Sequence, residues 1–227
     1  MPQNGSEHMS DASLFFVIVN RGKANDLLHK AQAIGATGGT ILLGEGTMQS
    51  GLYDFLGINQ THKDVLLTAV PDQVTDQLYS MLREQFKLHK RFRGIAFSVP
   101  YRPWKPGDDT AAPLPRPTNA PYLCLLTVVE RGLGDECMAI AREAGAQGGT
   151  IIHAHGAGVP QDFYFPLVIE PQKDIVLIVT PRAGAAPIHK AIFNRMNLAQ
   201  TGKGIIFALP VLSTVGLYEE RRQEVKP

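Results

Sequence analysis

Apolar residues form two kinds of pattern along the first half of the chain, short continuous runs and positions repeated every three or four residues. Residues 14–20, 41–43 and 65–70 form short apolar runs bounded by turns, and runs of this kind are typical of buried β-strands. In two other segments the apolar residues recur at three- and four-residue steps, which predicts helices with one buried face. These helical positions are Leu27, Leu28, Ala31 and Ile34 in the first segment, and Leu78, Met81, Leu82 and Phe86 in the second.

Turn residues mark the ends of these elements. Gly35 follows the first helical segment, where a left-handed cap is expected, and Pro71 with Asp72 precedes the second. Residues 94–100 form one more apolar run and predict a final strand. The predicted order is therefore βαββαβ, which is the ferredoxin-like arrangement.

The whole pattern occurs twice, at a constant offset of 110 residues. Residues 35–41 (GATGGTI) recur as 145–151 (GAQGGTI), and residues 94–100 (GIAFSVP) recur as 204–210 (GIIFALP). The matches gather at turns and strand ends, where backbone geometry and strand register are set. The sequence thus predicts an α+β protein made of two tandem ferredoxin-like βαββαβ domains.

This repeat sets the domain boundaries and the two cores. The expected parts are a disordered leader (1–12), a first domain (13–101), a proline-rich linker (102–120), a second domain (121–213) and a tail (214–227). We expect each domain to bury its own helix faces, with these residues inside: Leu27, Ala31, Leu78 and Leu82 in the first, and Ile140, Ala144, Ile188 and Ile192 in the second.

Composition excludes several classes of protein. The formal net charge is +1, so no overall field attracts nucleic acid or an acidic membrane. No apolar run reaches the ~18 residues that span a bilayer, and none at the start is typical of a signal region. The two cysteines, Cys124 and Cys137, are too few for a disulfide framework, which favours a cytoplasmic protein.

No residues in the sequence form a known catalytic pattern. There is no nucleophile elbow, Walker loop or dinucleotide fingerprint, so we expect neither an enzyme, catalytic residues nor a resident cofactor. Residues 93–97 (RGIAF) match part of an RNA-recognition signature, but that signature belongs on the third strand and this segment is the fourth. We therefore expect no nucleic acid partner.

His153 and His155 alternate along a strand and so face the same side, as metal ligands would. The sequence places no cysteine or carboxylate beside them, and two ligands do not complete a site. A polar strand end is the preferred interpretation, and we expect no metal site.

The turn GATGGTI with the following Gly44 and Gly46, the residues 53–56 (YDFL) and the last strand together resemble the PII family of nitrogen-regulatory signalling proteins. The resemblance covers nearly all of both copies. It implies a cytoplasmic homotrimer whose domains form rings, with a small anionic effector, an adenine nucleotide, bound between neighbouring domains. It also implies a target, a membrane transporter or an enzyme of nitrogen or related metabolism.

The resemblance implies effector contacts at two turns and at the base of a loop. Ile95 and Ile205 stand where the family has a lysine, so Lys203, Arg91 or Arg93 would supply the positive charge. We expect the second copy to be the better site. A solvated basic turn, and glycines required only for positive φ, remain the alternatives. The full set of effector candidates is Gly39, Thr40, Gly46, Lys90, Arg91, Arg93, Gly94, Gly149, Thr150, Gly156, Thr201, Gly202, Lys203 and Gly204.

Two long segments between strands, 44–62 and 154–172, exceed the usual length of an ordered loop, which indicates a use in binding. In the family the corresponding loop reports the ligand to the target. Candidate docking residues here are Tyr53, Phe55, Phe163 and Tyr164. For Phe55 and the aligned Phe165, simple anchoring of the loop to its domain is the alternative.

A second function of another class stays open on the sequence. The chain is also similar to the CutA divalent-cation tolerance proteins, which would make it a structural or metal-linked trimer. Effector binding at the basic turns would favour the first function, and metal at His153 and His155 the second.

Overall fold

The structure is a computed structural model, and it describes residues 12–36, 38–47, 61–90, 93–101, 119–155 and 172–217. The predicted leader, most of the predicted linker, the greater part of both long loops and the end of the tail lie outside these residues. The first copy comprises β1 (Ala12–Asn20), α1 (Ala24–Ile34), β2 (Gly39–Gly46), β3 (Thr61–Pro71), the 3-10 turn η1 (Asp72–Val74), α3 (Thr75–Glu84) and β4 (Gly94–Tyr101).

The second copy repeats this order and adds a short strand at its end. Its elements are β5 (Tyr122–Glu130), α4 (Gly134–Glu143), β6 (Thr150–His155), β7 (Gln172–Pro181), α5 (Arg182–Arg195), β8 (Ile205–Val211) and β9 (Ser213–Val215). Both copies have the strand order of a ferredoxin-like sheet, so the predicted α+β class and the tandem βαββαβ arrangement are confirmed.

The two sheets join edge to edge into one antiparallel sheet of nine strands, in the order β8-β5-β7-β6-β2-β3-β1-β4-β9. The joint is the pairing of β2 with β6, in which Gly44 lies opposite Ile152 and Gly46 opposite Thr150. These two strands are equivalent in the repeat, so the joint relates the copies by an approximate twofold axis.

After β8 the chain crosses to the other end of the sheet. The Leu212 N–H donates to the Ser98 carbonyl at 3.3 Å, and β9 then pairs with β4, placing Val215 opposite Ala96. The side chain of Val215 is buried in the helix-side core of the first copy. The predicted boundary between second domain and tail therefore falls within a strand that belongs to the first copy's sheet.

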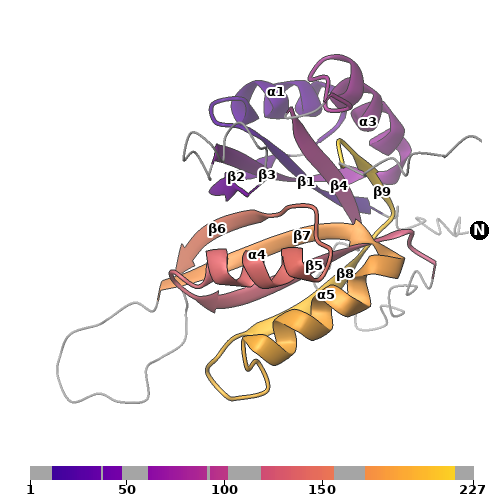
Figure 1. Cartoon of the computed structure of the whole chain (residues 1–227). Coiled ribbons are helices and arrows are strands. Elements are labelled where there is room, and N and C mark those ends of the chain that lie inside the picture. The colour runs from indigo at the N-terminus through magenta and orange to yellow at the C-terminus, as the bar shows by residue number, and fades with distance from the viewer. Residues whose placement is uncertain are drawn as a thin grey trace, which may run out of the picture.

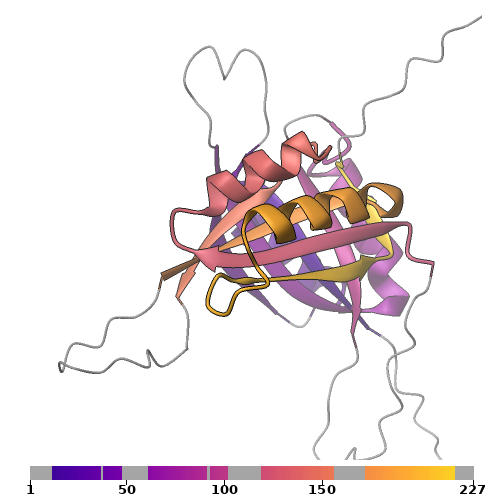
Figure 2. The same ribbon diagram turned by 60° about the horizontal axis from the view of Figure 1, so that its bottom comes forward.

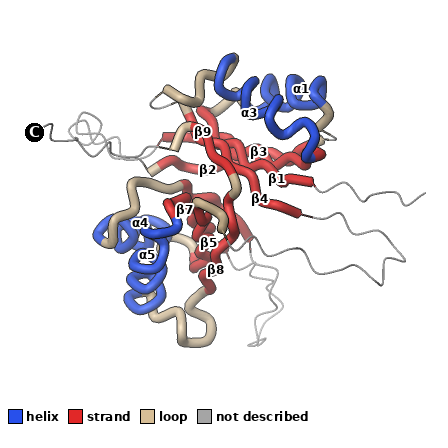
Figure 3. The backbone as a smooth tube through the Cα atoms, turned by 90° about the vertical axis from the view of Figure 1, so that its right-hand side faces the viewer, coloured by secondary structure: helices blue, strands red, loops and turns tan. Residues whose placement is uncertain are grey.

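Helices cover the outer face of each sheet, and the two inner faces pack against each other (Figures 1 and 3). Each copy has its own core beneath its helices. A third core lies between the sheets and draws on both copies, with Phe16 stacked on Phe97 at 4.9 Å and Cys124 and Leu177 among its buried members. The copies thus have separate outer cores and one shared inner core.

The predicted core residues are buried with one exception. Leu27, Ala31, Leu78, Leu82, Ile140, Ile188 and Ile192 are all buried, whereas Ala144 is only partly buried. Ala144 is the C-cap residue of α4, and Ala141, one turn earlier, faces the core instead.

The packing of the two inner faces affects one reason for expecting a ring of three domains. A ferredoxin-like sheet has an open face that must be covered, and in a ring the neighbouring domains would cover it. Here the other copy in the same chain covers it, so burial of the face no longer requires a ring. The homotrimer itself stays a prediction.

A buried aspartate makes the same contacts in both copies, and the residues involved recur at the 110-residue offset, Gly22 as Gly132 and Asp64 as Asp174. Asp64 accepts hydrogen bonds from the N–H groups of Gly22 and Ala24, at 2.7 and 3.3 Å. Asp174 accepts from Gly132 and Gly134 in the same way, at 2.8 and 3.2 Å. Each carboxylate thereby fixes the turn between the first strand and first helix of its copy.

Candidate functional site

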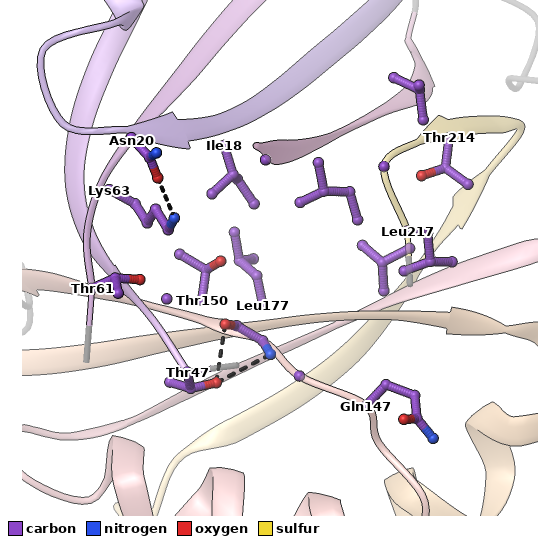
Figure 4. A pocket seen from close by; sticks show the side chains of 18 of the residues that line it. Ile18, Asn20, Thr47, Thr61, Lys63, Gln147, Thr150, Leu177, Thr214 and Leu217 are labelled. Carbon is purple, nitrogen blue, oxygen red and sulfur yellow. Dashed lines mark hydrogen bonds between the residues drawn. The ribbon is translucent and has the colours of Figure 1, made fainter. Parts of the chain in front are cut away.

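A cavity of about 610 Å³ lies where the two copies meet (Figure 4). The first copy contributes the ends of β1 and β3, the segment that leads into β4, and Gly46 with Thr47 at the end of β2. The second copy contributes residues 147–149 before β6, Thr150 at the start of β6 and part of β7, and residues 214–217 complete the wall. The cavity is therefore formed within one chain, by segments far apart in the sequence.

The charged side chains along this cavity are all basic. Lys63, Arg83 and Lys90 line it together with His89, and no aspartate or glutamate is among the lining residues that the structure describes. Three cations without a nearby carboxylate favour the binding of an anion.

Lys63 lies in the most confined position of these cations. Its Nζ donates to Asn20 Oδ1 at 2.6 Å, and among the described residues it has no carboxylate partner. Burial lowers the pKa of Lys63 from its usual value, because the charged form loses hydration. A bound anion would compensate for that loss.

Part of the remaining wall is apolar. Ile18, Ile95, Leu177 and Val179 line the cavity, as does Tyr122. Ile95 occupies the place where the resemblance predicts a lysine, so that position adds apolar surface here rather than charge. The cavity thus offers cations on one part of its surface and apolar contacts on another, which suits a ligand with an anionic group and a flat apolar ring.

Thr47 connects the two copies at the edge of the cavity. Its N–H donates to the Gly149 carbonyl at 3.0 Å, and the Gly149 N–H donates to Thr47 Oγ1 at 3.1 Å. Arg142 on α4 also donates to the Thr47 carbonyl. Thr47 is the residue at which the first long loop begins, so the base of that loop is tied to the second copy.

We expect Thr47→Val to lower the free energy of unfolding by about 1–2 kcal/mol, because the Gly149 N–H loses its acceptor in a part-buried place. Urea denaturation measures this change. Thr61→Val is the matched control, since Thr61 is exposed on the cavity rim, and it should change the free energy by less than ~0.5 kcal/mol. Equal effects of the two variants would contradict a role for Thr47 in joining the copies.

The structure brings together only some of the predicted effector residues. Gly46, Lys90, Gly94, Gly149 and Thr150 line the cavity. The described candidates that do not line it are Gly39, Thr40, Arg93, Thr201, Gly202, Lys203 and Gly204. Arg91, Gly156 and the docking candidates Tyr53, Phe55, Phe163 and Tyr164 lie outside the described residues.

The cavity thus combines the basic turn of the first copy, through Lys90, with the glycine turn of the second copy, through Gly149. Residues 201–204, the basic turn expected to form the better site, do not line it. Sequence reasoning missed Asn20, Lys63 and Arg83. A lysine before the repeated aspartate was visible in both copies, but nothing local shows that it faces a cavity.

Among the described effector candidates, Gly94, Gly202 and Gly204 have positive φ, whereas Gly39, Gly46 and Gly149 do not. Gly94 has φ of 140° and Gly204 has φ of 132°, and a Cβ would lie 2.2 Å from the Ile18 carbonyl oxygen at Gly94 and 2.4 Å from that of Val128 at Gly204. Glycine is therefore needed at both turns whether or not a ligand binds.

His153 contacts carboxylates from both copies. Its Nδ1 lies 2.8 Å from Asp174 Oδ1, and its Nε2 lies 3.6 Å from Glu45 Oε2 across the joint. In the described part of the chain, no group of three or more His, Cys, Asp or Glu side chains is arranged to hold a metal ion. The side chain of His155 is not described.

Both cysteines are buried, and burial raises the pKa of Cys124 to about 12 and that of Cys137 to about 11. Both thiols are thus protonated at neutral pH, which makes them poor nucleophiles. None of the described helices is long and apolar enough to cross a membrane.

Comparison with known proteins gives similarity of fold alone. No family model and no curated protein matches the sequence. Among solved structures, CPII bound to ADP and bicarbonate, from Thiomonas intermedia K12, is 16% identical over 41% of this chain and 85% of its own, with a TM-score of 0.30. A microcompartment protein from Desulfitobacterium hafniense DCB is 13% identical over 88% of this chain and 94% of its own, with a TM-score of 0.26.

A third structure, chlorite dismutase from Candidatus Nitrospira defluvii, is 9% identical over 90% of this chain and 92% of its own, with a TM-score of 0.25. CPII matches over about the length of one copy, whereas the other two match over most of the chain. Similarities at this level assign neither ligand nor reaction.

Proposed function

We propose that this chain is a PII-like regulatory protein that binds a small anionic effector, an adenine nucleotide, in the cavity between its two copies. The observation that carries the proposal is the set of three cations, Lys63, Arg83 and Lys90, around a cavity without a lining carboxylate. The apolar wall beside them would receive the base, and the cations the phosphates.

The position of the cavity supports a regulatory use. Gly46 and Thr47 line it and lead directly into the first long loop. A ligand that contacts the Thr47–Gly149 connection would therefore touch the base of the segment that we propose to contact the target, a transporter or an enzyme of nitrogen or related metabolism. The site needs no second chain, so effector binding does not depend on the predicted homotrimer.

Isothermal titration calorimetry against ATP, ADP, AMP, cyclic AMP and bicarbonate tests the proposal. We expect at least one adenine nucleotide to bind with one site per chain, since the three cations of this cavity, Lys63, Arg83 and Lys90, all come from the first copy. Absence of binding by all five compounds at millimolar concentration would contradict the proposed function.

Nucleotide affinity should also depend on pH. The pKa of Lys63 is lowered by burial, so this lysine loses its proton at a lower pH than an ordinary lysine does. A neutral amine cannot pair with a phosphate, and affinity should therefore fall as the pH rises through the lowered pKa. Titrations in a series of alkaline buffers measure this decrease in affinity. In Lys63→Met the affinity should be lower at neutral pH and should decrease less as the pH rises. An affinity with the same alkaline dependence in Lys63→Met would contradict this role.

A further inference from the structure

The second copy has a counterpart of the cavity wall, but its chemistry differs. At the 110-residue offset, Phe193 stands where the first copy has Arg83, and Gln200 stands where it has Lys90. The backbone confirms the offset at this turn, because Lys87 and its counterpart Asn197 both have positive φ, of 55° and 54°. At these two positions the first copy has a basic side chain and the second an uncharged one, whereas the counterpart of Lys63 is again a lysine, Lys173.

The corresponding surface of the second copy is apolar and exposed. The side chains of Ile205 and Phe207 on β8 are 57% and 41% exposed, whereas Phe97, the equivalent of Phe207, is fully buried. Ile205 and Phe207 are two residues apart on a strand and so share one face. Leu212, just after β8, is also exposed.

The two sheet edges also differ in their strand partners. The outer edge of β4 pairs with β9, and residues 214–217 line the cavity next to it. On the other side, β8 pairs with β5 and has no second strand partner among the described residues. Figure 2 shows β8 in yellow-orange at the outer margin of the second copy.

The free edge also lacks the charged side chains that normally prevent strands from pairing between molecules. Residues 205–212 (IIFALPVL) carry no charge, and an uncharged apolar edge strand readily adds another strand. Pro210 has no N–H to donate, which confines pairing to the first part of the strand, around Phe207.

We propose that β8 is the interface with a second copy of this chain, pairing antiparallel with its equivalent around a twofold axis. The fold already contains an interface of this kind, since equivalent strands of the two copies, β2 and β6, pair antiparallel edge to edge. Pairing of β8 with β8 would extend the same sheet across two chains. It would cover Ile205 and Phe207 on both, and two uncharged edges meet without repulsion.

Sedimentation equilibrium at micromolar concentration tests this interface. The wild-type protein is expected to have about twice the 24.7 kDa of one chain, and Ile205→Lys and Phe207→Lys are each expected to lose the dimer. Leu43→Lys is the matched control, because Leu43 is 52% exposed on β2, away from β8, and this variant should stay dimeric. Circular dichroism and thermal unfolding of the three variants check that they fold.

This dimer and the homotrimer predicted from the sequence are alternatives, and the measured mass decides between them. A wild-type monomer, a mass three times that of one chain, or a dimer that both β8 variants retain would overturn the proposal. Loss of the dimer in Leu43→Lys as well as in the β8 variants would also overturn it, because the effect would then not be specific to this edge. The result is independent of nucleotide binding, so the failure of either proposal leaves the other to be judged separately.

Discussion

The double variant Lys63→Ala, Lys90→Ala is expected to bind its adenine nucleotide at least about a hundredfold more weakly than the wild-type protein. Each lysine would contribute a charge-assisted contact to phosphate worth ~1.5–3 kcal/mol, and ~1.4 kcal/mol corresponds to a tenfold change in affinity. Both side chains line the same cavity, and no described carboxylate in its lining competes for them. Calorimetry on folded variant protein measures the change.

Lys203→Ala is the control for this variant. Lys203 lies in the basic turn of the second copy and does not line the cavity, so its removal should leave the affinity within about twofold of the wild-type value. The opposite pattern, loss of binding in Lys203→Ala with little change in the double variant, would move the effector to the second copy's turn. The sequence alone favours that turn.

Asp174→Ala is expected to lower the free energy of unfolding by about 2–4 kcal/mol. The carboxylate is buried, and it accepts hydrogen bonds from the N–H groups of Gly132 and Gly134. Arg131 Nε also lies 3.6 Å from it. Removal leaves two backbone donors without their acceptor, at a cost of ~1–3 kcal/mol each where the groups stay dry. Equilibrium urea denaturation measures the loss.

Asp26→Ala provides the comparison on an exposed helix. Asp26 pairs with Lys30 one turn away at 3.2 Å, and exposed pairs of this kind contribute ~0.3–0.5 kcal/mol. A loss in Asp174→Ala no larger than that in Asp26→Ala would show that the buried carboxylate does not fix the turn. Asp64→Ala should behave as Asp174→Ala does, since Asp64 makes the equivalent contacts in the first copy.

The elements of the fold could be predicted because their signals are local. Apolar periods of two kinds and the repeated turns defined four strands and two helices in each copy, and the structure confirms this order. The strand β9 could not be predicted in the same way. It has three residues, too few to show a period, and its partner β4 lies more than a hundred residues earlier.

The pairing of β2 with β6 could not be predicted from the sequence either. Residues 44–46 read as part of a loop, yet they pair with β6 and extend β2. This pairing depends on the shape of both copies rather than on the residues of either strand.

Only part of the candidate site could be predicted, because only some of its residues stand in local sequence motifs. Gly46, Gly94 and Gly149 stand at turns that the repeated motifs mark, and the cavity includes all three. Lys63 gives no such signal, because its place in the cavity follows from how the second copy packs on the first. The cavity also depends on residues 214–217, which the sequence places in a tail.

A crystal structure of the protein with its tightest-binding adenine nucleotide would show directly whether the effector binds between the two copies. We expect one nucleotide in each chain in this cavity, with phosphate oxygens within hydrogen-bonding distance of Lys63 and Lys90. We also expect the base to lie against the wall formed by Leu177 and Val179. A nucleotide bound at residues 201–204, or only between different chains with the cavity between the copies empty, would contradict it.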